Sequence, residues 1–447
     1  MRRLPLIRIF VLAMTNEEYI DLHLLDDVRT LALRSAPEGI DIKWCLQQIE
    51  GWQKAREKLP RWAGTDGLWY PPVLSMEQCS SEQTAEYKRG IVCRLLSEAS
   101  DRQAFADLTG GYGIDFSYMA TLFDSSDYVE RNTELCRIAE HNFSMLRLSA
   151  ANVVCADSSD FLERNAASYD LIYLDPARRD DVGRKTVAIA DCTPDVVQLQ
   201  DRLMAVSRFV MIKLSPMLDI SAALSVLRHV LEIHVVSVRG ECKELLFVQD
   251  SQYDGSPTYY ASNLGLADEV FSCTDEQRKR ATLRVAGEHV ASASATCLYE
   301  PHASILKAGI QDVLCERYGV AKLHPMSNLF VSASPVQDFP GRSFKIVASC
   351  GFNKKELRTM LAGVSKANIT VRNFPASVAE IRKKLRLAEG GDVYLFATTV
   401  ADGSHRLIRC VKHTTTGPGL TPSSKRASTS NILMYTATGI RRRSRTR

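Results

Sequence analysis

A short glycine-rich segment stands between two predicted elements in the first half of the chain. Asp107-Leu-Thr-Gly-Gly-Tyr-Gly113 follows the apolar run 104–108 and precedes a helical pattern. Small residues in such a turn let the backbone approach a ligand closely. The turn therefore predicts a ligand site, and its candidate cofactor-binding residues are Asp107, Thr109, Gly111 and Gly113.

Two acidic residues stand at the ends of the next two predicted strands. Glu130 ends the strand after the glycine-rich turn, and Asp157 follows the strand after that. A carboxylate at the first position can accept both ribose hydroxyls of an adenosine, and one at the second can reach the adenine edge. Turn and acids together predict a nucleoside-containing cofactor. The alternative is that they are ordinary caps and turns of a sheet.

The details of the turn narrow the choice of cofactor. No G-K-[ST] sequence is present, which excludes a phosphate-binding P-loop. The dinucleotide pattern G-x-G-x-x-G is incomplete, because Gly111 and Gly113 are followed by Phe116. A methyl donor carries no phosphates and tolerates this loss, so S-adenosylmethionine is the predicted cofactor. An NAD-dependent dehydrogenase is an alternative, and it predicts nicotinamide binding.

A second candidate site follows the strongly apolar run 169–174. It reads Asp175-Pro-Ala-Arg178-Arg179, and ligands of open α/β sheets bind beyond the carboxyl ends of strands. A rigid turn with Pro176 would present the Asp175 carboxylate to an amine nucleophile, as hydrogen-bond acceptor or base. Asp175, Pro176 and Arg178 are the candidate catalytic residues. Arg178 and Arg179 could hold a phosphate or balance Asp175, and Arg179 is assigned to substrate binding; a salt-bridged loop is the alternative.

Alternating strands and helices surround these residues. Apolar patterns predict strands at 104–108, 127–130, 152–156, 169–174, 209–214, 233–238 and 245–248, and helices at 116–123, 135–148, 160–164, 195–206 and 220–230. This alternation predicts an α/β fold with a Rossmann-like, mostly parallel sheet and helices on both faces. The last connection is too short for a parallel crossover, so the last strand should be antiparallel.

The flanking regions have a different texture. Helical periodicity fills 17–59 up to Pro60, and Ser80, with Gln83 at capping-box spacing, is expected to begin another helix. From Tyr299 the chain reads as a small α+β unit. Its predicted helices are 304–318, 354–361 and 378–385, and its predicted strands are 329–332, 344–348, 369–372 and 393–398.

Charge is unevenly distributed over the 447 residues, which are enough for two or three domains. The whole chain is +4, yet residues 341–413 contain 14 Lys and Arg against 5 Asp and Glu, and residues 414–447 contain 7 against none. The basic C-terminal third suggests a polyanionic partner, with a solvated lysine-rich face as the alternative. Lys383 and Lys384, on the last predicted helix, are candidate substrate-binding residues, and 414–447 is expected to be disordered.

Other sequence features bear on compartment and cofactors. Twelve scattered cysteines without a C-x-x-C pair favour a reducing compartment, and no apolar stretch reaches the ~18 residues of a membrane span. A cytoplasmic protein is expected. The isolated histidines lack ligand spacing, so no metal is expected. Arg8 interrupts the apolar run of the first residues, which argues against a secretory signal, and Met14 is the expected start.

In their order along the chain, these motifs resemble those of class I S-adenosylmethionine-dependent methyltransferases. The matching positions are Asp107–Gly113, Glu130, Asp157 and Asp175–Arg178. The last turn is similar to the Asp/Asn-Pro-Pro-aromatic turn of enzymes that methylate exocyclic or amide nitrogens, but Ala177 and Arg178 replace its second proline and its aromatic residue. Thr109 also stands where the family usually has glycine.

A closer resemblance spans roughly Thr15–His413. The segments that carry it are Lys58–Pro60, Gln78–Ala85, Leu174–Arg179, Lys213–Pro216, Tyr299–Pro301, Phe339–Arg342 and Val371–Pro375. They are similar to the THUMP-like-domain methyltransferases of Bacteroidetes-type bacteria. The resemblance implies helices in 1–70, a methyltransferase domain in 71–298, a ferredoxin-like segment in 299–340, a THUMP-like domain in 341–413 and a basic tail in 414–447.

The same resemblance implies RNA, either tRNA or rRNA, as the substrate class. It places the helix from Ser80 over the cofactor, and Lys213 and Ser215 on the acceptor side as substrate-binding residues. Lys88 is expected either to reach the site or to be solvated. A non-catalytic RNA-binding protein with a degenerate methyltransferase fold is the other alternative. It predicts that Asp175→Ala changes neither RNA affinity nor cellular function.

Overall fold

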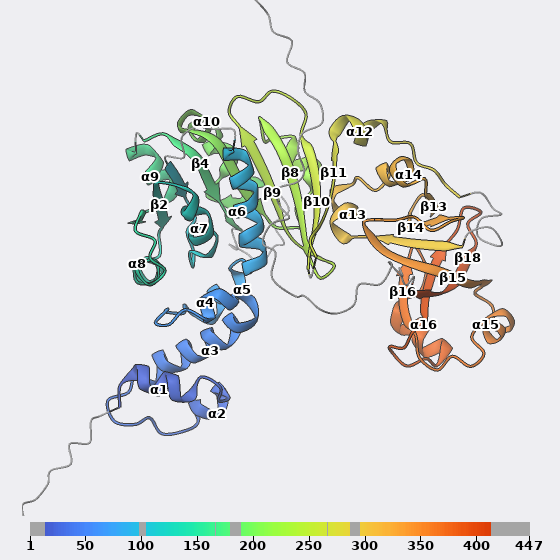
Figure 1. The fold of residues 1–447 in the computed structure, drawn as a ribbon, viewed down its shortest axis with the longest axis horizontal. Coiled ribbons are helices and arrows are strands. Elements are labelled where there is room, and N and C mark those ends of the chain that lie inside the picture. The colour runs from blue at the N-terminus through green and yellow to red at the C-terminus, as the bar shows by residue number, and fades with distance from the viewer. Residues whose placement is uncertain are drawn as a thin grey trace, which may run out of the picture.

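The computed structural model describes residues 14–97, 104–165, 167–178, 189–265, 267–286 and 296–412. Helices at the N-terminal end lead into a large central sheet, and a second sheet lies at the C-terminal end (Figure 1). The residues before the expected start at Met14 and the basic tail 414–447 lie outside these ranges. Within the described part of the chain, no helix combines the length and apolar character needed to cross a membrane.

The N-terminal region is helical, as predicted, but the pattern 17–59 is divided. It forms α1 Asn16–His23, α2 Val28–Ala32 and α3 Ile42–Lys58. New helices begin at Asp27 and Asp41, which are the N-caps of α2 and α3, because their carboxylates accept the backbone N–H of Thr30 and Trp44, respectively. Three further helices follow, α4 Pro60–Ala63, α5 Val73–Gln78 and α6 Glu82–Leu96.

The central sheet confirms the predicted fold class. Its strands are β1 Ala104–Asp107, β2 Ser125–Glu130, β3 Ala151–Cys155, β4 Tyr169–Leu174, β7 Ser207–Leu214, β8 Val230–Val238, β9 Glu241–Asp250, β10 Thr258–Leu264 and β11 Glu269–Thr274, in the order β11-β10-β8-β9-β7-β4-β1-β2-β3. Neighbours from β3 to β7 are parallel, and β9 is antiparallel to both β7 and β8. The predicted antiparallel strand is therefore present, while β10 and β11 extend the sheet beyond the prediction.

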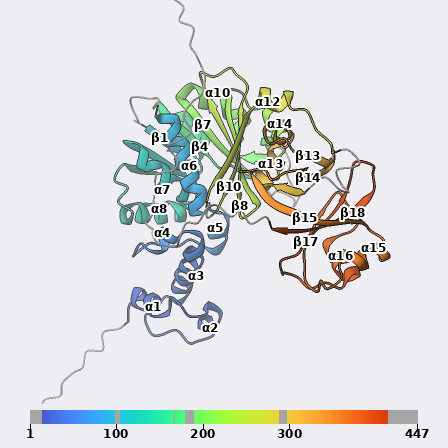
Figure 2. The ribbon, with the colours of Figure 1, turned by 45° about the vertical axis from the view of Figure 1, so that its right-hand side comes forward.

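Helices flank this sheet on both faces (Figures 1 and 2). They are α7 Ile114–Met119, α8 Thr133–Met145, α9 Ser158–Arg164, α10 Val196–Val206 and α11 Ile220–Leu224. The predicted helix 220–230 was too long, because Val230 already belongs to β8. Strand order reverses between β1 and β4, and open α/β sheets bind ligands at such a reversal.

The C-terminal segments build one sheet together. Its order is β13-β14-β12-β15-β18-β17-β16, with β12 Cys297–Pro301, β13 Ala321–His324, β14 Ser327–Ser332, β15 Gly341–Gly351, β16 Asn368–Arg372, β17 Tyr394–Thr399 and β18 His405–Lys412. The pairing of β12 with β15 joins residues 299–340 to residues 341–412. The domain limits given in the sequence analysis stay a prediction.

A helical layer connects the two sheets. The predicted helix 304–318 is divided into α13 Ala303–Ala308 and α14 Val313–Tyr318, because Gly309 adopts a positive φ of 68° and ends the first. α13 packs against β8, β9 and β10 of the central sheet. One apolar core runs through this layer, from Ile233 and Phe247 of the central sheet to Ile305 and Phe330. The remaining helices are α12 Asp275–Arg280, α15 Lys354–Met360 and α16 Val378–Leu385.

Candidate active site

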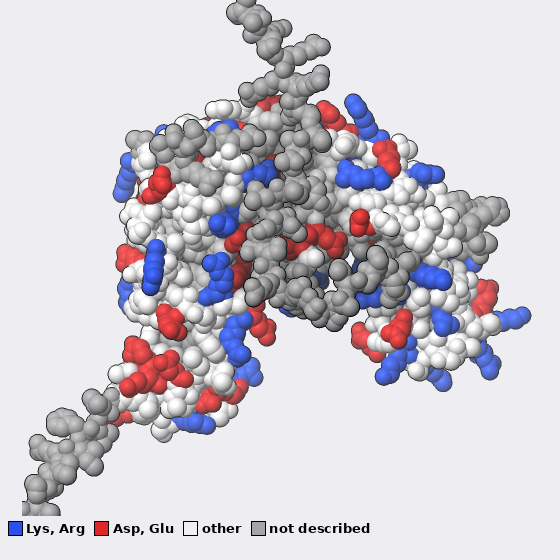
Figure 3. All heavy atoms as spheres, in the orientation of Figure 1, with Lys and Arg blue, Asp and Glu red and all other residues white. Residues whose placement is uncertain are grey.

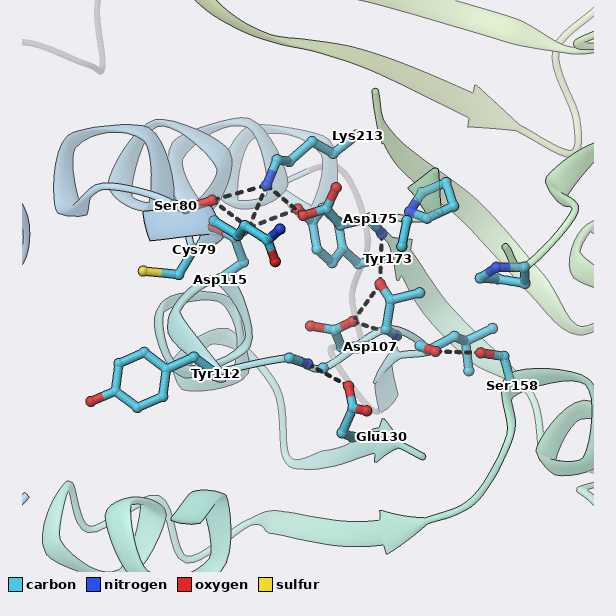
Figure 4. Close-up of a pocket in the computed structure, with 18 of the residues that line it drawn as sticks. Cys79, Ser80, Asp107, Tyr112, Asp115, Glu130, Ser158, Tyr173, Asp175 and Lys213 are labelled. Atoms are coloured by element: carbon cyan, nitrogen blue, oxygen red, sulfur yellow. Dashed lines mark hydrogen bonds and ion pairs between the residues drawn. The ribbon is translucent and has the colours of Figure 1, made fainter. Parts of the chain in front are cut away.

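A cavity of about 830 Å³ lies beyond the carboxyl ends of β1, β2, β4 and β7, where the strand order reverses. Figure 4 shows the side chains that surround it, with Glu130 on one side and Asp175 and Lys213 on the other. The cavity is lined by all six candidate cofactor-binding residues and by four others of the predicted site, namely Asp107, Thr109, Gly111, Gly113, Glu130, Asp157, Asp175, Pro176, Lys213 and Ser215.

The glycine-rich turn is shaped by contacts that only glycine permits. Gly113 has a φ of 83° and forms the N-cap of α7. At Gly110 a Cβ atom would lie 2.2 Å from Cε2 of the buried Tyr128 ring. The Tyr128 hydroxyl in turn donates to the Gly111 carbonyl. Gly110 was not among the candidate residues, because its constraint comes from a strand that follows it in sequence.

Thr109 connects the two predicted sites. Its backbone N–H donates to Asp107 Oδ1 at 2.9 Å, and its hydroxyl oxygen accepts the backbone N–H of Asp175 at 2.6 Å. The glycine usual at this position in the family could not make the second bond. Asp107 is 1% exposed, and burial raises the pKa of its carboxyl well above the ordinary value.

Glu130 is held by the backbone on both sides. Oε2 accepts the N–H of Gly111 at 2.9 Å, and Oε1 accepts the N–H of Asn132 at 2.8 Å. Each carboxylate oxygen has two acceptor positions, so one remains on each for a ligand hydroxyl. Asp157 is exposed at the cavity wall and caps α9 by accepting the Ser159 N–H at 2.9 Å. Asp157 thus has the capping role that the alternative interpretation expected, and it also lines the cavity.

Lys213 pairs with the candidate catalytic aspartate. Its Nζ lies 2.5 Å from Asp175 Oδ2 and 4.0 Å from Asp115 Oδ2. The Lys213 side chain is 13% exposed and the Asp175 side chain 38%, so the carboxylate is the more accessible member. Burial disfavours the charged lysine, but the two carboxylates outweigh it and raise the pKa of Lys213 above its ordinary value. Lys213 therefore holds Asp175 in place.

A buried charged network continues behind this pair. Lys88, which has no exposed side-chain surface, lies 2.8 Å from each carboxylate oxygen of Glu244 and 3.2 Å from Asp115 Oδ1. Asp115 Oδ2 accepts hydrogen bonds from the hydroxyls of Ser80 and Tyr173, both at 2.7 Å. Lys88 matches neither expectation, because its side chain is fully buried and contacts Asp115, which lines the cavity, without lining the cavity itself.

The role expected for Ser80 was wrong. Ser81, one residue later, is the N-cap of α6, because its hydroxyl accepts the Thr84 N–H at 3.3 Å. The Ser80 hydroxyl is free of the helix end and binds Asp115, and Lys88 and Lys213 donate to it at 3.2 and 3.4 Å. α6 therefore begins directly at the cavity.

The carboxyls of this network have opposite pKa shifts. Burial raises the pKa of Glu244 above its ordinary value, and the nearby lysines only partly oppose this. Burial acts in the same direction on Asp115, but Lys88 and Lys213 outweigh it and lower the pKa of that carboxyl. Glu244, Asp115 and Tyr173 were not predicted as site residues, because they come from three elements far apart in the chain.

Other predicted residues lie elsewhere. Arg178 is in the two-residue strand β5 Ala177–Arg178, which pairs with β6 Cys192–Thr193, and Arg179 lies outside the described residues. Ser215 Oγ accepts the Met217 N–H at 3.3 Å at the cavity. Lys383 and Lys384 are exposed on α16, in the second sheet's domain and away from the cavity (Figure 1).

Within the described residues, no group of three or more His, Cys, Asp or Glu side chains is arranged to hold a metal ion. The groups that line the cavity include carboxylates, a lysine, hydroxyls and the backbone of the glycine-rich turn. These groups can bind a nucleoside through Glu130 and orient an amine through Asp175.

Comparison with known proteins gives adjoining matches in the C-terminal half. A THUMP domain-like family model matches residues 341–412, and a ferredoxin-like domain model matches residues 298–340. No curated protein matches the chain significantly.

Solved structures extend the comparison to nearly the whole chain. A candidate methyltransferase from Porphyromonas gingivalis W83 is 33% identical, with a TM-score of 0.77, and the match covers 89% of this chain and 97% of that one. A candidate methyltransferase from Escherichia coli is 13% identical, with 37% and 87% covered and a TM-score of 0.28. A candidate RNA methyltransferase from Pyrococcus horikoshii is 13% identical, with 35% and 72% covered and a TM-score of 0.26.

The two weaker matches carry no weight for the activity of this chain. The first spans both sheets and the helical layer between them at an identity of 33%, and it agrees with the two domain matches. The chain belongs to the bacterial family of methyltransferases that carry a THUMP-like domain.

Proposed function

We propose that this protein transfers a methyl group from S-adenosylmethionine to RNA, with a base nitrogen as the acceptor. The observation that carries the proposal is the cavity at the strand-order reversal, where the glycine-rich turn and Glu130 face the Asp175 turn. Its volume of about 830 Å³ is in the range of small-molecule sites. Membership of the family supports the same activity.

The residues present fit this cofactor. Glu130 keeps one acceptor position on each carboxylate oxygen, which matches the two hydroxyls of a ribose. Gly111 lines the cavity without a side chain, and a Cβ atom there would come no nearer than 3.7 Å to Thr109 O. Glu130, the turn from Asp107 to Gly113, and Asp157 would hold the cofactor.

When bound, S-adenosylmethionine supplies a methyl group on a positively charged sulfur. The protein's contribution is to place the acceptor in line with that group, because orientation is the main lever in such transfers. Lys213 occupies Asp175 Oδ2, and among the described residues Oδ1 accepts no hydrogen bond. Oδ1 is therefore the atom that accepts an N–H of the acceptor amine, and Thr109 fixes the backbone of the same residue.

The C-terminal surface supports RNA as the substrate class. Lys and Arg side chains gather over the end of the molecule that holds α15 and α16 (Figure 3). The exposed members are Lys354, Lys355, Arg358, Lys383, Lys384 and Arg386. A cluster of exposed cations binds phosphates without reading sequence, which suits a domain that anchors RNA while the cavity handles one base.

Calorimetric titration with S-adenosylhomocysteine tests the cofactor site. Wild type should bind in the micromolar range. Glu130→Ala should bind roughly 10- to 100-fold more weakly, because hydrogen bonds to a charged group are lost. The control variant Glu140→Ala, at an exposed glutamate of α8, should bind like wild type. Absence of binding by wild type contradicts the proposal and favours the non-catalytic RNA-binding alternative.

A second assay tests the acceptor. Total RNA from cells lacking the protein is incubated with the enzyme and methyl-labelled S-adenosylmethionine. Wild type should label RNA, and Asp175→Ala should bind S-adenosylhomocysteine normally but fail to label it. Equal labelling by both proteins would remove Asp175 from the reaction.

A further inference from the structure

A second cavity, of about 480 Å³, lies between the N-terminal helices and the central domain. It is walled by the beginning of α3, the loop at Trp69 and the beginning of α8. Thr133 and Glu134 of α8 line this cavity, while Asn132 and Leu135, from the same turn, line the active-site cavity. The start of one helix is thus shared by both cavities.

Two tryptophans form a corner of this second cavity. All four tryptophans of the chain lie between residues 44 and 69, and Trp44 and Trp69 line the cavity. Both are half-buried, and their rings meet edge to face at 6.3 Å with an angle of 89°. Within the described residues neither indole N–H has a hydrogen-bond partner, whereas that of Trp52 donates to the Ala63 carbonyl. The corner therefore offers flat apolar surface with free donors.

Trp69 is firmly held from behind. Its backbone N–H donates to Asn142 Oδ1 at 2.8 Å, and its carbonyl accepts from Asn142 Nδ2 at 2.9 Å and from the Tyr112 hydroxyl at 3.0 Å. Its ring stacks on His141 at 3.9 Å with an angle of 8°. Asn142 is fully buried. A platform fixed in this way loses little freedom when a ligand binds, which favours affinity.

Polar groups of both kinds surround the indoles. Lys43 and Arg137 are exposed and form no ion pair with any described residue; the Arg137 guanidinium lies 5.8 Å from the Trp69 ring centre. Two carboxylates, those of Asp41 and Glu134, also line the cavity, and the Asp41 carboxylate accepts a backbone N–H as the N-cap of α3. Gln47 donates to the Tyr70 carbonyl through Nε2, which leaves its own carbonyl oxygen as an acceptor. The lining therefore combines ring surface, donors and acceptors.

This combination matches the chemistry of a nucleotide. A nucleobase is a flat ring with donors and acceptors at its edge, and aromatic side chains bind such rings by stacking. Arginine and lysine recognise base acceptors or phosphate, and a glutamate accepts base N–H groups. A purely apolar ligand would leave these polar groups unpaired, and a simple anion would not use the indoles.

We propose that the second cavity binds a nucleotide, with its base against Trp44 and Trp69 and its polar edge or phosphate at Lys43 and Arg137. The identity of the nucleotide rests on the proposed function. The first turn of α8, which both cavities share, borders the Glu130 side of the active-site cavity, opposite Asp175, so the nucleotide belongs to the substrate RNA at a distance from the acceptor base. A free mononucleotide offers the same chemistry, and the test separates the two sources.

The test uses the full chain and two kinds of probe, the four nucleoside 5′-monophosphates and a short single-stranded RNA of mixed sequence. Affinity is measured by calorimetry, and quenching of tryptophan fluorescence in wild type reports contact with the indoles. Trp44→Ala should weaken binding of the RNA roughly 5- to 150-fold, as expected for loss of a base-stacking contact. Trp44→Phe keeps an aromatic ring and should retain most of the affinity.

Arg137→Ala should also weaken binding, while Arg29→Ala, an exposed arginine on α2, should not. Tighter binding of the RNA than of any monophosphate supports a strand; equal affinities support a free nucleotide in the same site. Absence of binding and quenching, or affinities unchanged in both Trp44→Ala and Arg137→Ala, overturns the proposal.

S-adenosylhomocysteine binding is measured in every sample. Its retention in the variants shows that they are folded and that only the second cavity has changed. If wild type binds nucleotides but not S-adenosylhomocysteine, the methyltransferase proposal fails and the nucleotide site stands. The two proposals can therefore fail separately.

Discussion

Two clusters of charged side chains hold α6 against the central sheet, and they differ in what they face. The first is the network of Lys88, Glu244 and Asp115 behind the active-site cavity. The second lies further along the helix, where Arg94 donates to both oxygens of Glu232 at 2.7 and 2.5 Å. Only the first cluster contributes residues to the cavity lining among those described.

The second cluster is closed on itself. His234 Nε2 lies 3.0 Å from Glu232, and the Tyr87 hydroxyl bonds His234 Nδ1 at 2.8 Å and the Ser262 hydroxyl at 2.5 Å. Each polar group of this cluster has a hydrogen-bond partner within it, and the charge of Glu232 is balanced by Arg94. This arrangement serves packing, since the cluster fixes α6 on β8 and β10 without reaching a ligand.

The first cluster is open and has excess acid. With Asp175 included, three carboxylates face two lysines. Buried ion pairs are weak evidence for stability, because apolar side chains of similar size often do as well. Carboxyls with shifted pKa values that gather beside a cavity, as Asp115 and Glu244 do, are instead a feature of functional sites. Docking of α6 therefore requires only a cluster of the second kind, and ligand chemistry explains the first.

Loss of Lys88 should give the largest effect. Lys88→Met leaves Glu244 and Asp115 buried without their cation and should lower the free energy of unfolding by about 3–5 kcal/mol. Denaturant unfolding measures this. The double variant Lys88→Met/Glu244→Leu removes charge of both signs and should recover most of the loss. A single-variant loss no larger than that of an exposed lysine would erase the distinction between the clusters.

The second-largest effect is expected from acid, which should lower the free energy of unfolding by protonating Glu232 in the second cluster. Burial opposes ionisation of Glu232, but hydrogen bonds from His234 and Arg94 outweigh it and lower its pKa from 4.5 to about 2. A lowered folded pKa stabilises the fold above pH 4.5, and this contribution of about 3 kcal/mol is lost as pH falls from 4.5 towards 2. Burial also lowers the pKa of His234, so protonation of that ring acts in the same direction.

Urea midpoints measured between pH 7 and pH 3 check this, with Glu232→Gln as the control that should lose most of the pH dependence. In the first cluster the shifts of Asp115 and Glu244 have opposite signs and partly cancel. Equal slopes for wild type and Glu232→Gln would place the acid sensitivity elsewhere.

Lys213→Met should have the smallest effect on folding. Asp175 is 38% exposed and can be solvated when its partner is lost, so the free energy of unfolding should fall by about 1 kcal/mol or less. Affinity for S-adenosylhomocysteine should stay near wild type, while RNA labelling should fall by roughly 100-fold because Asp175 is no longer held in position. Lys213→Arg should restore part of the labelling. Unchanged labelling in Lys213→Met would assign the lysine to packing.

Local spacing made one half of the site predictable. The turn from Asp107 to Gly113 lies within a few residues, and Glu130 and Asp157 end successive parallel strands, so strand order brings them to one edge. The sheet class and its antiparallel strand followed from alternation and one short connection. The same reasoning did not predict β10 and β11, because no strand pattern was recognised in their residues.

The other half depends on contacts between distant elements. Folding brings together Lys88 from α6, Asp115 from α7 and Glu244 from β9. The sequence alone does not distinguish a buried lysine from an exposed one. Ser80 illustrates the limit: its spacing to Gln83 favoured Ser80 over Ser81 as the cap, but in the folded chain the Ser80 hydroxyl binds Asp115 and Ser81 caps α6. Gly110 was missed for a similar reason, since Tyr128 sets its constraint.

The helical layer between the two sheets fixes the distance between the C-terminal domain and the active-site cavity. α13 packs on the central sheet within one continuous core, and the Lys307 ammonium donates to the Leu218 carbonyl in the loop that lines the cavity. The basic surface on α16 and the cavity therefore keep a set separation. An RNA that binds at both places must have its acceptor base at this distance from the segment that contacts α16. Folded RNAs in which that distance is shorter or longer would not reach both places at once.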